Sequence, residues 1–167
     1  MLTGMISSVS GAVNTSGANV TVDSDAQFVS GADNNIAIGT NALDSTTTDA
    51  ADSNLAIGVD ALTSLETGNV NIVIGHQAGN ATEDLDNAVI IGGQAGQGVL
   101  AANADGTVLI GKNAGKALTD PGEANGANIA IGYNAMLQHT TGAKNIAIGY
   151  GAMDGTDAGS NSLNSNN

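Results

Sequence analysis

Short apolar segments recur along the chain, and most of them are opened by Asn and all are closed by Gly. Seven copies occur, at residues 35–39, 54–58, 71–75, 88–92, 107–111, 128–132 and 145–149. Successive closing glycines lie 19, 17, 17, 19, 21 and 17 residues apart. One strand-like segment in each repeat of this length is typical of a stacked, quasi-one-dimensional fold. The pattern predicts an all-β protein, a parallel β-solenoid in which each copy forms one rung.

The repeats divide the chain into three parts. Residues 35–153 form the seven-copy array, and the polar residues 154–167 are predicted to be a C-terminal tail or linker. Residues 1–34 carry no copy, although residues 19–23 and 26–29 have the composition of short strands. An end rung of a solenoid exposes unpaired backbone and an open core, and terminal sequences therefore commonly differ from the repeats. We predict that residues 1–34 are an attachment or capping segment.

Alternation along a strand assigns the apolar residues of each copy to two faces. The residue before the closing glycine is Ile in all seven copies, and it shares a face with an Ile, Leu or Val two positions earlier. We expect this face to fill the core of the coil. The invariant file consists of Ile38, Ile57, Ile74, Ile91, Ile110, Ile131 and Ile148.

The middle position of each segment lies on the opposite face and is never polar. Its residues are Ala37, Ala56, Val73, Ile90, Leu109, Ala130 and Ala147. A strand that is apolar on both faces is covered on both sides, and soluble monomers avoid long exposed apolar stripes. We therefore expect the middle file to be buried against other copies of the same chain, as the interface of a homo-oligomer.

The closing glycine permits the turn at the end of each strand, and the residue after it varies freely. That variety is typical of an outward-facing corner. Tyr133 and Tyr150 occupy equivalent corners 17 residues apart, so we expect them to stack on neighbouring rungs. They are candidate surface-contact residues, and the alternative is that they only cover the edge of the coil.

Composition excludes several classes of partner. The chain has three lysines, no arginine and a net charge of −13, so it lacks the cations that binding to nucleic acid requires. No apolar run is long enough to span a bilayer, so no membrane insertion is expected. Cysteine is absent, and no His pair has ligand spacing, so no metal or cofactor is expected. The acidic residues Glu83, Asp84 and Asp86, or Asp49 with Asp52, leave calcium as an alternative to a solvated loop.

Two glycine-rich matches to nucleotide-binding motifs are better explained by the repeat. Residues 106–112 match the start of a phosphate-binding loop, but Asn113 replaces the Ser or Thr that would bind Mg²⁺. Residues 92–98 resemble a dinucleotide-binding turn without a following crossover helix. No catalytic set is discernible, and we predict that the chain is not an enzyme.

Several copies resemble the repeats of known surface fibres. Residues 131–136, 140–142 and 145–150 resemble the "NTAIGYNAL…NTTG" repeats of bacteriophage tail fibres, and they are similar to the head repeats of trimeric autotransporter adhesins. The resemblance covers residues 35–153. It implies a left-handed parallel β-roll that associates as a homotrimer.

The resemblance also indicates which function to expect. We expect a structural virion protein, a short trimeric fibre, spike or decoration on the surface of a phage head or tail that contacts a host glycan or protein. Residues 1–34 are expected to join it to other virion proteins. A bacterial adhesin head on the cell surface is the first alternative, although no signal peptide or anchoring barrel is recognised. A glycan-degrading tailspike is the second.

Overall fold

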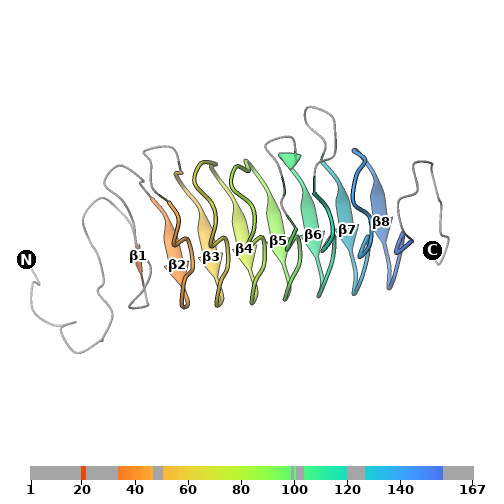
Figure 1. Ribbon diagram of the computed structural model, residues 1–167, viewed down its shortest axis with the longest axis horizontal. Helices are drawn as coiled ribbons and strands as arrows, with labels where there is room; N and C mark the ends of the chain where they lie inside the picture. The colour runs from red at the N-terminus through yellow and green to blue at the C-terminus, as the bar shows by residue number, and fades with distance from the viewer. Residues whose placement is uncertain are drawn as a thin grey trace, which may run out of the picture.

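Parallel strands stacked along one axis form the molecule (Figure 1). The computed structural model describes residues 20–21, 34–46, 51–98, 100, 104–119 and 127–155. Within these ranges there is no α-helix, and one sheet runs in the order β1 to β8. The strands are β1 (Val20–Thr21), β2 (Ile36–Ile38), β3 (Leu55–Ile57), β4 (Ile72–Ile74), β5 (Val89–Ile91), β6 (Val108–Ile110), β7 (Ile129–Ile131) and β8 (Ile146–Ile148).

The pairing register follows the sequence repeat. Every strand from β2 to β8 pairs in parallel with its neighbour so that equivalent positions of consecutive copies are partners. Loops of different length between the strands absorb the variation in repeat length. The predicted β-solenoid is confirmed, with one short strand in each repeat.

One further strand precedes the array. Val20 pairs with Ile36 and Thr21 with Ala37, so β1 extends the sheet beyond the first copy and lies within the predicted strand 19–23. The predicted strand 26–29 and the tail from residue 156 onward lie outside the described residues. The attachment or capping role of residues 1–34 stays a prediction.

The two faces of the strands are the reverse of those expected. The middle residues are buried inside the coil of their own chain, with 0–1% of their surface exposed; they are Ala37, Ala56, Val73, Ile90, Leu109, Ala130 and Ala147. These residues were predicted to form the interface between chains, and that prediction is wrong because no partner can reach them. The predicted core file faces outward instead: Ile38, Ile57, Ile74, Ile91, Ile110, Ile131 and Ile148.

An internal ladder of asparagines explains the reversal. Asn35 precedes Ala37 by two residues and shares its face, and both are fully buried. The Oδ1 atom of Asn35 accepts a hydrogen bond from the backbone N–H of Asn54 at 2.8 Å, and Asn54 Oδ1 accepts one from Asn71 N at 3.0 Å. The Nδ2 atom of Asn54 donates to the carbonyl of Gly68 at 2.9 Å. Because buried polar groups are tolerated when they are hydrogen-bonded, the face that carries Asn can turn inward.

In each rung, the side chains at two positions compensate for each other in size. The middle strand residue and the residue six positions later, which has a φ of 49–57°, both lie inside the coil, except that Met153 in the last copy is only partly buried. Where the strand residue is Ala, its partner is Leu or Met; where it is Val, Ile or Leu, its partner is Gly. The pairs are Ala37/Leu43, Ala56/Leu62, Val73/Gly79, Ile90/Gly96, Leu109/Gly115, Ala130/Met136 and Ala147/Met153. Each rung is thus filled to a similar degree, whichever of the two positions carries the larger side chain.

Exchanging one such pair tests this reciprocity. A Cβ atom at Gly79 would lie 3.8 Å from Val73 Cγ1 and 3.2 Å from Leu62 Cδ2, so Gly79→Leu alone crowds the core. Val73→Ala alone leaves a cavity, and we expect each single variant to lose about 2–3 kcal/mol of unfolding free energy. The double variant copies the Ala56/Leu62 rung and is expected to recover at least about 1 kcal/mol of that loss in a double-mutant cycle. Additive losses in chemical denaturation at one protein concentration would contradict the reciprocity.

Candidate interaction surface

The outward strand residues form a continuous apolar surface, which we call the outer stripe. It consists of two files that run the length of the array, with no charged or polar member. The first file is Ile36, Leu55, Ile72, Val89, Val108, Ile129 and Ile146. The second is Ile38, Ile57, Ile74, Ile91, Ile110, Ile131 and Ile148.

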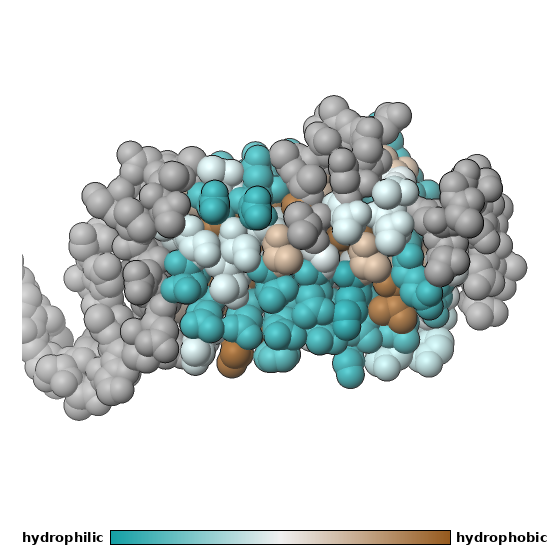
Figure 2. Space-filling view, in the orientation of Figure 1, coloured by the Kyte–Doolittle hydropathy of each residue, from teal (hydrophilic) through white to brown (hydrophobic). Residues whose placement is uncertain are grey.

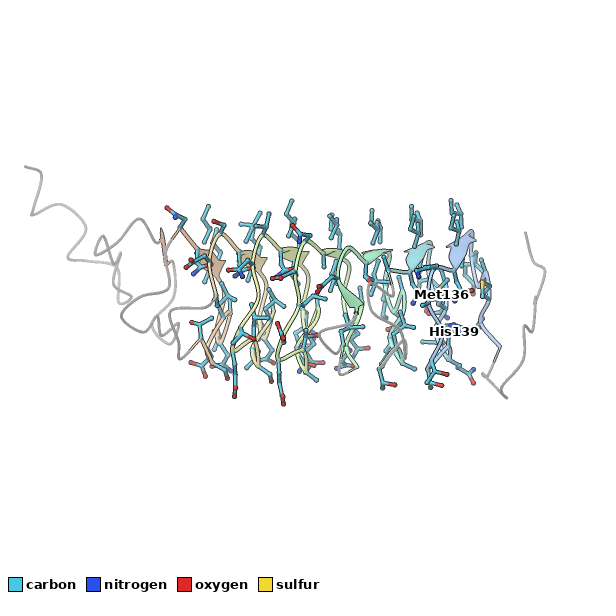
Figure 3. The ribbon with its side chains drawn as sticks, turned by 90° about the horizontal axis from the view of Figure 1, so that it is seen from above. Met136 and His139 are labelled. Carbon is cyan, nitrogen blue, oxygen red and sulfur yellow. The ribbon has the colours of Figure 1, made fainter. Side chains whose placement is uncertain are left out.

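The side chains of the outer stripe project from one side of the molecule (Figure 3). Ile146 and Ile148 on β8 are 64% and 50% exposed, and Ile72 on β4 is 42% exposed. At about 4.8 Å per strand, seven strands make a stripe about 30 Å long. Among the described residues on the face turned to the viewer in Figure 2, hydrophilic ones predominate in the lower part, in contrast to the uniformly apolar outer stripe. A contiguous apolar surface of this kind marks a site of interaction.

The corner after each strand carries the predicted tyrosine pair. Tyr133 and Tyr150 stack with ring centroids 5.3 Å apart and an interplanar angle of 8°. They are 43% and 74% exposed, so both rings remain accessible from solvent. The predicted stacking is confirmed, and the surface-contact role of the pair stays a prediction.

Replacing Tyr150 with Ser tests that role. Since most of the Tyr150 surface is exposed, its removal is expected to lower the unfolding free energy by about 1 kcal/mol or less, the usual value of a stacked aromatic pair. If the chain is the expected virion protein and Tyr150 contacts the host, the variant should adsorb more weakly to host cells. A lower melting temperature with unchanged adsorption would show that the ring only covers the edge of the coil.

Next to that corner lies a column of amide and acidic residues in the left-handed region of φ. Asn41, Asp60, Gln77, Gln94, Asn113 and Asn134 have φ values of 56–60°. Asn41 Nδ2 donates to Asp60 Oδ1 at 2.9 Å, and Asn113 Nδ2 donates to Asn134 Oδ1 at 2.9 Å. Asn and Asp tolerate this backbone conformation better than most residues. The column therefore supports the turn, and its hydrogen bonds join particular pairs of rungs.

Some of the acidic side chains in the loops accept hydrogen bonds from backbone N–H groups. Asp86 Oδ1 accepts a hydrogen bond from Asn69 N at 2.5 Å, and Asp105 Oδ1 accepts one from Asp86 N at 2.9 Å. In the same column Asn69 Oδ1 accepts one from Asp52 N at 2.8 Å. No group of three metal-ligating side chains occurs among the described residues, while Asp49 lies outside them. Asp86 and Asp105 thus link consecutive rungs.

Two further sequence features have structural explanations. Within the apparent phosphate-binding loop, Val108–Ile110 is strand β6, so its backbone is engaged in the sheet. His139 lies between β7 and β8 and is only 7% exposed, and its Nε2 atom lies 3.4 Å from Asn145 Nδ2 (Figure 3). In the described part of the chain, no helix is long and apolar enough to cross a membrane.

Together these observations define the chain as a parallel β-solenoid repeat protein with one apolar side. Comparisons with protein-family models, curated proteins and solved structures find no match to it.

Proposed function

We propose that the chain is a structural virion protein, a left-handed β-roll that forms a short homotrimeric fibre, spike or decoration on a phage particle. The observation that carries the proposal is the outer stripe. Fourteen aliphatic side chains stand in two files on the outside of the coil, without a polar or charged residue among them. Several of the most exposed large hydrophobic residues in the described part of the chain belong to it.

Self-association is the simplest way to cover this surface. Burying apolar area contributes roughly 25 cal/mol per Å², and a surface shared with identical copies needs no separate partner gene product. If three copies surround an axis parallel to the solenoid, each stripe meets two others at equal heights. The number three and the left-handed coil rest on the resemblance to phage tail-fibre and adhesin-head repeats. The interface is thereby assigned to the outer stripe.

A stiff, laterally associated rod suits a mechanical and presenting role. Stacked rungs joined by backbone hydrogen bonds leave the corners and loops free to vary without disturbing the core. We assign contact with a host glycan or protein to those corners, including the Tyr133–Tyr150 pair. Attachment to other virion proteins is assigned to residues 1–34.

Sedimentation equilibrium tests the assembly. The chain has a mass of 16.2 kDa, and we expect a single species of about three times that mass at all accessible concentrations. A folded monomer would contradict the proposal. Images of the phage particle labelled on this protein test the location. Loss of incorporation after deletion of residues 1–30 would support the attachment role, and normal incorporation would contradict it.

The two alternative functions predict different results. A bacterial adhesin head predicts a longer parent reading frame with a membrane anchor. A tailspike enzyme predicts that the purified protein converts host polysaccharide to oligosaccharides. We expect neither result.

A further inference from the structure

One exposed residue beside the outer stripe has an unusual backbone conformation. Val70 has a φ of 62°. It is the single β-branched residue among the described non-glycine residues with positive φ. The left-handed region is unfavourable for L residues and especially so for those branched at Cβ. The conformation of Val70 therefore costs free energy that most other residues at this position avoid.

The fold does not require valine at this position. The equivalent residues in other rungs are Asn34, Ser53, Asn87 and Lys144, with φ values of 58–62°, Gly106, with a φ of 73°, and Ala127, which is not among the residues with positive φ. All of the equivalents that share the left-handed conformation are polar, charged or glycine. The backbone N–H of Val70 donates to the carbonyl of Asp52 at 3.0 Å, and that bond is independent of the side chain.

Packing within the chain does not explain the side chain either. Val70 is 56% exposed, so most of it contacts solvent rather than the core. It precedes the fully buried Asn71, and Ile72 of the outer stripe follows with 42% of its surface exposed. Val70 lies two residues before Ile72 and is itself exposed, so it adds an apolar side chain at the start of the β4 rung, next to the outer stripe.

We propose that Val70 is a contact residue of the self-association surface and packs against a second copy of this chain. This inference rests on the proposed assembly through the outer stripe. In the isolated chain, Val70 carries two free-energy costs. Its left-handed backbone is unfavourable for a β-branched residue, and its apolar side chain is exposed to water. Strain that folding does not require is typical of sites where another interaction compensates for it. Continuity with the outer stripe identifies that interaction as association.

Subunit exchange between two differently labelled preparations of the full chain tests the inference. Val70→Asn relieves the strain but removes the apolar contact, whereas Val70→Thr keeps the β-branch and makes the side chain polar. We expect both variants to exchange subunits faster than the unmodified protein, Val70→Asn by about tenfold or more. Val59→Thr is the matched control, because Val59 is 43% exposed on a corner outside the stripe. We expect it to exchange at the unmodified rate.

The outcomes separate this inference from the proposed function. If the unmodified protein assembles and both Val70 variants exchange at its rate, Val70 is not a contact and the inference fails while the assembly stands. Equal acceleration by Val70→Thr and Val59→Thr overturns it as well. If the unmodified protein sediments as a monomer, the proposed assembly fails, and this inference fails with it. Circular dichroism of each variant establishes that it is folded.

Discussion

Replacing Ile72 with Asp is expected to dissociate the assembly. Ile72 lies in the outer stripe on β4, and association would bury its new carboxylate without a partner. An unpaired charge in a desolvated interface costs about 3–5 kcal/mol for each chain, which is a large fraction of the stability of a small protein. We expect sedimentation equilibrium to detect monomers or unfolded chains in place of a trimer.

The matched control is Val59→Asp. Val59 is 43% exposed and Ile72 is 42% exposed, and both are β-branched, so the two substitutions change similar surfaces. Val59 lies on a corner, where a charge stays in water, and we expect its variant to remain a trimer. Ile72→Thr keeps a residue suited to strands and separates loss of association from loss of the strand. Trimers of normal stability from Ile72→Asp would contradict the assignment of the stripe.

Replacing Gly92 with Ala is expected to disrupt the fold itself. Gly92 has a φ of 135°, and a Cβ atom there would lie 2.5 Å from the carbonyl carbon and oxygen of Gly111 on the next rung. Backbone atoms of a stacked rung cannot move away without breaking the register of the sheet. We expect a loss of about 4 kcal/mol or more of unfolding free energy, measured by thermal or chemical denaturation.

The neighbouring glycine provides the control for this prediction. At Gly93 a Cβ atom would have only the carbonyl oxygen of His76 nearby, at 3.9 Å, and its φ is not in the left-handed region. We therefore expect Gly93→Ala to change the unfolding free energy by no more than about 0.5 kcal/mol. Similar melting temperatures for the two alanine variants would show that the glycine column tolerates side chains.

The glycine column illustrates what spacing alone could predict. Each closing glycine from Gly39 to Gly132 stacks on the next one, and a Cβ atom would approach its backbone to 2.3–2.6 Å. An invariant residue at a period of 17–21 positions therefore reflects direct contact between rungs. The repeat predicted the strands, their parallel order and their register, because the same position of every copy has the same neighbours above and below.

The assignment of the two strand faces could not be made from hydropathy. The invariant Ile file was predicted to fill the core, and the Ala37 file, which is also free of polar residues, was predicted to be buried between chains. Within the coil, however, the Asn35 and Asn54 side chains are satisfied by backbone groups of the neighbouring rung and of the turns. The face that carries Asn35 can therefore be enclosed although Asn is polar.

The reciprocal sizes at Ala56/Leu62 and Val73/Gly79 were visible in the sequence and could have indicated the inward face. Two positions whose volumes compensate across several copies are expected to share one enclosed space. The left-handed conformation of Val70 had no comparable signal, because valine does not recur at its position in the other copies. The burial of His139 did have one, because Leu65 and Leu118 occupy the same position in their copies and are also buried.

The sequence by itself therefore determined a stacked parallel β-solenoid and the residues that align between its rungs, because a repeat imposes the same local structure and the same neighbours on every copy. Only the tertiary structure decided which apolar face the coil encloses. Both faces are apolar, and the choice depends on hydrogen bonds of Asn35 and on space filled by Leu43, which belong to other parts of the turn. Closing the turn around these side chains places Ile36 and Ile38 outside, where a partner can reach them.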